Sequence, residues 1–124
     1  MSKTSKEPVI SEAQAQEHDL LAPLLHSVLG EVKEFTKKKQ DEPLNKLKVR
    51  AANKILSRIR ALLATEPTFE FLELLDEDTL PTNSDAVIIM AQHVSSMKQF
   101  KDNYHGYDKH GGQNRWFTKE NPRR

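Results

Sequence analysis

The feature that most constrains this chain is a long amphipathic stretch from Asp41 to Leu63. Its apolar residues recur at steps of three and four, the spacing that keeps one side of an α-helix apolar. We expect Asp41 to cap this helix and Pro43 to lie in its first turn, where a missing N–H costs nothing. The residues expected to face the core are Leu44, Leu47, Ala51, Ala52, Ile55, Ile59, Leu62 and Leu63.

A row of cations runs along the same stretch. Its members are Lys46, Arg50, Lys54 and Arg58. Because each follows the last by four residues, they lie on one side of the helix, where they can contact the phosphates of a nucleic acid or an acidic protein surface. Arg58 borders the apolar face, so it can instead pair with acidic residues further along the chain. Lys48 falls within the apolar face.

Another amphipathic helix is expected before this stretch. Ser11 followed by Gln14 has the spacing of a capping box, which predicts a helix that begins at Glu12. Pro23 predicts a kink or short break near Ala22, because proline disfavours helical conformation in the residue before it. The cations Lys37, Lys38 and Lys39 close the helix near the carbonyl end of its dipole, and they add to the positive charge available for a partner.

Two helices are expected after it. The apolar run from Phe69 to Leu75 predicts a short helix of about two to three turns. Thr82, Asn83 and Ser84 are candidate caps of a last long helix that ends before Gly106. Its apolar face is expected to comprise Val87, Met90, Ala91, Val94, Met97, Phe100 and Tyr104.

These elements predict an all-α fold, a small antiparallel bundle of three long helices and one short helix over residues 11–105. Residues 1–10 have little apolar content and are expected to be disordered. Residues 106–124 carry glycines and cations, and we expect them to form a flexible tail.

Length and composition limit the class of protein. The chain has 124 residues, which fits one domain, and it has no cysteine, which excludes disulfides and cysteine-ligated metal sites. Its N-terminal residues lack the apolar run of a signal peptide, and no apolar stretch approaches the roughly 20 residues that span a bilayer. We therefore expect a cytoplasmic protein without a membrane partner.

The net charge of +1 conceals a sorting of charge along the chain. Ten Lys or Arg residues stand against three acidic residues between Lys33 and Arg60, whereas Ala61 to Asp85 contains seven acidic residues and no Lys or Arg. The two blocks can pair within the chain, which favours a monomer, or between two copies, which favours a homodimer. We expect the homodimer.

The segment Arg115, Trp116 and Phe117 holds the only tryptophan of the chain. Large aromatic residues are common anchors of protein interfaces, so these residues are candidates for docking on a partner. Equally, they can fold back and cover the core of the bundle.

No residue pattern predicts an enzyme. Asp102, His105, Asp108 and His110 lie close in sequence, but their spacing matches no zinc site, so we expect neither a metal nor a cofactor. The chain has no Gly-rich phosphate loop and no nucleophile motif.

The expected function is that of a small non-catalytic interaction protein, an accessory or regulatory subunit of a larger assembly. Its charged helix faces and its aromatic tail would contact another protein. The alternative is a sequence-nonspecific binder of DNA or RNA backbones that uses the cationic helix.

Overall fold

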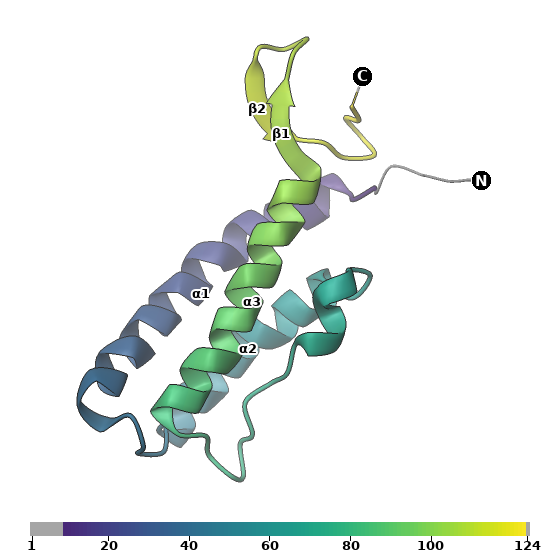
Figure 1. The fold of residues 1–124 in the computed structure, drawn as a ribbon. Helices are drawn as coiled ribbons and strands as arrows, with labels where there is room; N and C mark the ends of the chain where they lie inside the picture. The colour runs from purple at the N-terminus through teal and green to yellow at the C-terminus, as the bar shows by residue number, and fades with distance from the viewer. Residues whose placement is uncertain (1–8, 124) are drawn as a thin grey trace.

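The computed structural model describes residues 9–123 as three α-helices with a two-stranded sheet at one end (Figure 1). The elements are α1 (Glu12–Lys39), α2 (Lys46–Leu62), the 3-10 helix η1 (Pro67–Phe71), α3 (Asn83–Tyr104), β1 (His105–Asp108) and β2 (Gln113–Trp116). Helices α2 and α3 run in the same direction, and α1 runs opposite to both. The protein is mostly helical, as the sequence predicts, but the all-α prediction omits the sheet.

Helix α1 begins where the sequence predicts. The Gln14 N–H donates to Ser11 Oγ at 3.1 Å and the Ser11 N–H donates to Gln14 Oε1 at 2.8 Å, which completes the capping box. Of the kink or short break predicted near Ala22, the break does not occur, because α1 continues through Pro23. Pro23 is exposed, whereas Leu21 and Leu25 on either side of it are buried. Proline removes one backbone hydrogen bond of the helix, and burial of the face that carries Leu21 and Leu25 offsets this loss.

Helix α2 begins later than the sequence predicts. Its cap is Asn45, whose side chain accepts a backbone N–H at 2.8 Å, and not Asp41. Pro43 lies outside the helix and forms an isolated antiparallel bridge with Thr82. The backbone before α2 is therefore held by the segment that precedes α3, a tertiary contact that local sequence signals do not reveal.

The buried face of α2 is also rotated from the predicted one. Leu47 is 74% exposed and Ala51 is exposed as well, although the sequence places both in the core. The rotation arises because residues 72–82, which we call the strap, cover the side of α2 that carries Asn53. The buried residues of α2 are Val49, Ala52, Asn53, Leu56, Ile59 and Leu62.

The strap replaces most of the short helix predicted from Phe69 to Leu75. Helix η1 ends at Phe71, and the chain then extends with Leu72 and Leu75 buried. Asn53 Nδ2 donates to the Leu75 carbonyl at 2.8 Å, and the Leu75 N–H donates to Asn53 Oδ1 at 2.9 Å. The side-chain amide thus satisfies both backbone groups of Leu75, as a neighbouring strand would. The strap returns the chain to the end at which α2 begins, so α3 runs parallel to α2 (Figure 1).

Helix α3 confirms the prediction of a last long helix. Its cap is Thr82, whose Oγ1 accepts the Asp85 N–H at 3.1 Å. Of the apolar face that the sequence predicts, Ala91 is exposed. The apolar residues of α3 that are buried in the core are Ala86, Met90, Met97, Phe100 and Tyr104.

The C-terminal segment forms structure that the predicted flexible tail lacks. Strands β1 and β2 pair antiparallel with His105 opposite Trp116, and Gly112 has a left-handed φ of 68° in the turn between them. Beyond β2 the chain reaches the start of α1, where the Lys119 N–H donates to the Ile10 carbonyl at 2.8 Å. Ile10 is only 2% exposed, so the prediction of disorder is wrong at this residue. Residues 1–8 lie outside the described residues.

One side-chain nitrogen in the core has no hydrogen-bond partner among residues 9–123. His93 is fully buried, its Nδ1 donates to the Ile89 carbonyl at 2.9 Å, and its Nε2 has no partner among residues 9–123. Burial lowers the pKa of His93; the bond to Ile89 opposes this effect, and the charge of Arg60 adds to it. The folded protein therefore holds His93 neutral at pH values where the unfolded chain binds a proton.

This histidine predicts a loss of stability in acid. Because the folded pKa lies below the unfolded value of about 6.5, stability falls as the pH falls below that value. We expect His93→Met to fold at pH 7.5 and to lose less thermal stability than the wild type between pH 7.5 and 5, since the thioether fills the site without titrating. Thermal unfolding followed by circular dichroism measures the difference. His26→Met, at an exposed position of α1, is the control and should keep the wild-type acid dependence; the same dependence in His93→Met would contradict the prediction.

Candidate functional site

The row of cations on α2 divides into two parts. Lys46, Arg50 and Lys54 are exposed and form no ion pair within residues 9–123; we call these three residues the cationic face. Steps of four residues place them about 6 Å apart along the helix axis. Arg58, in contrast, donates to both carboxylate oxygens of Glu17 in α1, at 2.6 and 2.9 Å, and this contact raises the pKa of Arg58. The alternative in which Arg58 pairs with the acidic block is therefore wrong.

An exposed apolar side chain lies at the edge of the cationic face. Leu47 follows Lys46 directly and precedes Arg50 by one turn. At 74% exposed, it is the most exposed large apolar residue in the described part of the chain. Protein interfaces bury apolar side chains within a polar rim, whereas contact with phosphates requires no leucine.

The run Lys37 to Lys39 lies at the end of α1, near the start of α2 (Figure 1). Lys37 Nζ lies 3.0 Å from a Glu34 oxygen and Lys39 Nζ lies 3.7 Å from a Glu42 oxygen, both in exposed pairs that contribute little stability. Lys38 is exposed and has no ion pair in the described residues. These lysines extend the positive surface beyond the cationic face.

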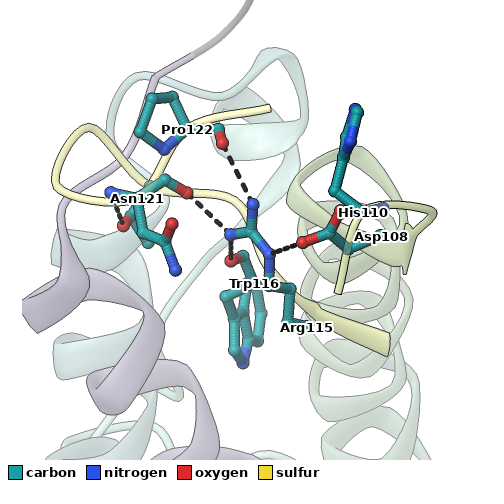
Figure 2. A network of polar contacts seen from close by, with 7 residues as sticks. Asp108, His110, Arg115, Trp116, Asn121 and Pro122 are labelled. Carbon is teal, nitrogen blue, oxygen red and sulfur yellow. Dashed lines mark hydrogen bonds and ion pairs between the residues drawn. The ribbon is translucent and has the colours of Figure 1, made fainter. Parts of the chain in front are cut away.

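Arg115 holds the C-terminal segment together (Figure 2). Its Nε donates to Asp108 Oδ2 at 2.7 Å, and the same guanidinium donates to the carbonyls of Trp116, Asn121 and Pro122 at 2.9, 2.7 and 3.0 Å. The side chains of Arg115 and Asp108 are 12% and 10% exposed, and the hydrogen bond from Arg115 lowers the pKa of Asp108. The arginine therefore has a clear role within the chain, as a tie between β1, β2 and the residues that follow.

The aromatic residues beside it also contact their own chain. Trp116 Nε1 donates to Asp19 Oδ2 at 3.0 Å, and its ring centroid lies 5.0 Å from that of His18. Phe117 is 8% exposed and lies against two guanidinium groups at 4.4 and 4.1 Å. This is the arrangement in which the two aromatic residues fold back onto the bundle. It leaves little of Phe117 for a partner.

The acidic and histidine residues near the hairpin are distributed over separate contacts. Asp102 pairs with Lys98 at 3.2 Å, Asp108 pairs with Arg115, and the His105 ring packs against Trp116. Within residues 9–123, no group of three or more His, Asp or Glu side chains is placed to hold a metal ion.

A second surface, which the sequence does not predict, lies between η1 and α3. It is an open hollow of about 480 Å³, and we call it the η1–α3 groove. Thr68 and Phe71 of η1 line one side, and Ile88, Gln92 and Ser95 of α3 line the other. Phe71 is 61% exposed and Ile88 is 58% exposed, so the groove presents two large apolar side chains to solvent.

The groove is built from the acidic part of the chain. Residues 61–97 contain seven Asp or Glu and no Lys or Arg. Glu70 precedes Phe71, and Asp85 lies one turn before Ile88; both are exposed and neither forms an ion pair within the described residues. One signal for the groove was available in the sequence. The run Phe69 to Leu75 is apolar at five of seven positions. One side of a two-turn helix cannot bury so many apolar residues, so some of them must be exposed.

Comparison of the chain with protein-family models, curated proteins and solved structures found no match. Among the described residues, no helix has the length and apolar character needed to cross a membrane.

Proposed function

We propose that this protein is a small non-catalytic binding protein, an accessory or regulatory subunit, whose cationic face contacts an acidic surface of another protein. The observation that carries the proposal is the set of three exposed cations beside Leu47 that form no ion pair within residues 9–123. Cations held in a fixed row on a helix attract and orient an anionic partner. Burial of Leu47 adds a favourable term that charge alone does not supply.

Binding of a nucleic-acid backbone is the second candidate function. The regular spacing of the cationic face favours it, because a rigid helix can offer one cation to each of several phosphates. Two features weigh against it. The apolar Leu47 is exposed beside the cations, and a Glu77 oxygen of the strap lies 3.4 Å from Asn53 Nδ2, which places a negative charge beside α2 one turn from Arg50. A polyanion would be repelled by that carboxylate, whereas a protein surface of mixed charge would accommodate it.

The test is affinity purification of the tagged chain from its native source with three baits. They are the wild type, Lys46→Ala/Arg50→Ala/Lys54→Ala, and a control, Lys101→Ala/Lys109→Ala/Lys119→Ala, which removes three exposed lysines elsewhere. We expect an acidic protein to co-purify with the wild type and the control, and recovery with the first triple variant to fall about tenfold, because each lost charge contact contributes roughly 0.5 kcal/mol. Equal recovery with all three baits would refute the proposal.

A gel shift with DNA and RNA at two salt concentrations distinguishes nucleic-acid binding from binding of a protein partner. Backbone binding must weaken steeply as salt rises. If the wild type gives a salt-sensitive shift and the Lys46→Ala/Arg50→Ala/Lys54→Ala variant does not, the partner of the cationic face is a nucleic acid and not a protein.

A further inference from the structure

The two charged surfaces of this chain do not neutralise each other. No ion pair within residues 9–123 joins the cationic face to the acidic residues of the segment 61–97. Among the described residues, Arg58 is the one α2 cation with an acidic partner, and that partner, Glu17, belongs to α1. Each copy of the protein therefore carries an unneutralised cationic surface and an unneutralised acidic one.

The two surfaces also match in their apolar parts. The cationic face presents Leu47 at its edge, and the η1–α3 groove presents Phe71 and Ile88, whose near neighbours in the chain, Glu70 and Asp85, are exposed carboxylates. A hollow of about 480 Å³ has room for a leucine side chain and the helix turn that carries it. An apolar side chain in a pocket, surrounded by complementary charges, is the usual centre of a protein interface.

We propose that the η1–α3 groove binds the cationic face of a second copy of this chain. Leu47 of one copy lies between Phe71 and Ile88 of the other, and the cations lie against Glu70 and Asp85. The inference rests on the proposed function, because it names a partner for the same cationic face. An acidic protein partner and the second copy then compete for Lys46, Arg50 and Lys54.

The arrangement of the fold allows this contact to form twice. The strap follows directly after η1, which lines the groove, and is hydrogen-bonded through Leu75 to Asn53 of α2, the helix that carries the cationic face. A two-fold axis near the strap places each cationic face on the groove of the other copy and closes the assembly at two copies. Without that axis, the same contact would build open chains.

Charge reversal on either surface tests the proposal. One variant, Lys46→Glu/Lys54→Glu, reverses the cationic face, and the other, Glu70→Lys/Gln92→Lys, reverses the groove; all four positions are exposed. Light scattering at tens of micromolar protein in low salt should show a dimer for the wild type and a monomer for each variant alone. An equimolar mixture of the variants should form a dimer, because in the mixed pair the reversed face meets the reversed groove and the two unchanged surfaces meet each other. Circular dichroism confirms that both variants fold.

The apolar part of the contact has its own variant. Leu47→Ser should raise the dissociation constant of the dimer at least about tenfold, since a buried leucine is lost from each of two equivalent contacts. Leu20→Ser is the control, because Leu20 is 50% exposed on α1. It should leave the dissociation constant unchanged.

Several results would overturn the inference. They are a wild-type monomer, a mixture of the two charge variants that stays monomeric, and open assemblies larger than a dimer. A wild-type monomer that still recovers an acidic protein through Lys46, Arg50 and Lys54 would leave the proposed function intact. A dimer that recovers no acidic protein would support the inference and end the proposed role as a subunit of another assembly.

Discussion

Replacing Phe100 with alanine should lower the free energy of unfolding by about 3–5 kcal/mol, the usual cost of removing a buried phenylalanine. Phe100 is 1% exposed and its ring contacts three others, with centroids 5.7 Å from His18, 4.9 Å from Tyr104 and 5.9 Å from Trp116. These partners belong to α1, α3 and β2, so the substitution leaves a cavity where three elements meet.

Urea unfolding followed by circular dichroism measures the effect. Tyr107→Ala is the matched control, because Tyr107 is an aromatic residue of β1 that is 62% exposed. Its loss should cost less than about 1 kcal/mol. Equal destabilisation by the two substitutions would mean that the ring cluster around Phe100 does not join the hairpin to the helices.

Replacing Asn53 with alanine should release the strap and cost about 2–4 kcal/mol. The substitution leaves the N–H and carbonyl of Leu75 without partners in a buried position, and each unsatisfied group costs about 1–3 kcal/mol. Asn53→Asp should be no better, because the new carboxylate would face the Leu75 carbonyl and Glu77.

Limited proteolysis with a glutamate-specific enzyme reports on the strap directly, since Glu73 and Glu77 lie within it. We expect faster cleavage at these residues in Asn53→Ala than in the wild type, together with a lower urea midpoint. Asn114→Ala, at an exposed position of β2, is the control. Cleavage at the wild-type rate in Asn53→Ala would show that the buried leucines hold the strap without the amide.

The parts of the fold that the sequence predicts are those encoded by local signals. The box formed by Ser11 and Gln14 lies within one turn of α1, and the Thr82 cap lies within one turn of α3. The parts that it misses depend on contacts between distant residues. Asn53 binds Leu75, 22 residues away, in the extended strap that replaces most of a predicted helix. Periodicity alone carries no information about such a partner.

The hairpin was missed for a related reason. Gly111 and Gly112 mark a turn, but the flanking strands have four residues each and a polar composition that gives no reason for burial. Burial comes instead from Trp116 packing on His18 of α1, which lies about a hundred residues earlier in the chain.

The candidate site shows the same division. The cationic face was predicted because exposed charges at four-residue intervals depend only on the helix that carries them. Leu47 was predicted to be buried, since its exposure follows from the rotation of α2 under the strap. The η1–α3 groove depends on where η1 ends, and the sequence extends that helix beyond Phe71.

The role of the cationic face as a protein contact is tested most directly by photocrosslinking from position 47, at its edge. The full chain, with p-benzoylphenylalanine in place of Leu47, is expressed in its native host and irradiated; a second chain carries the same group in place of Leu20, which is 50% exposed on α1. We predict crosslinked protein products from position 47, including one of twice the chain mass, and few from position 20. Crosslinks to nucleic acid alone, or equal protein products from both positions, would contradict a protein-binding role for the cationic face.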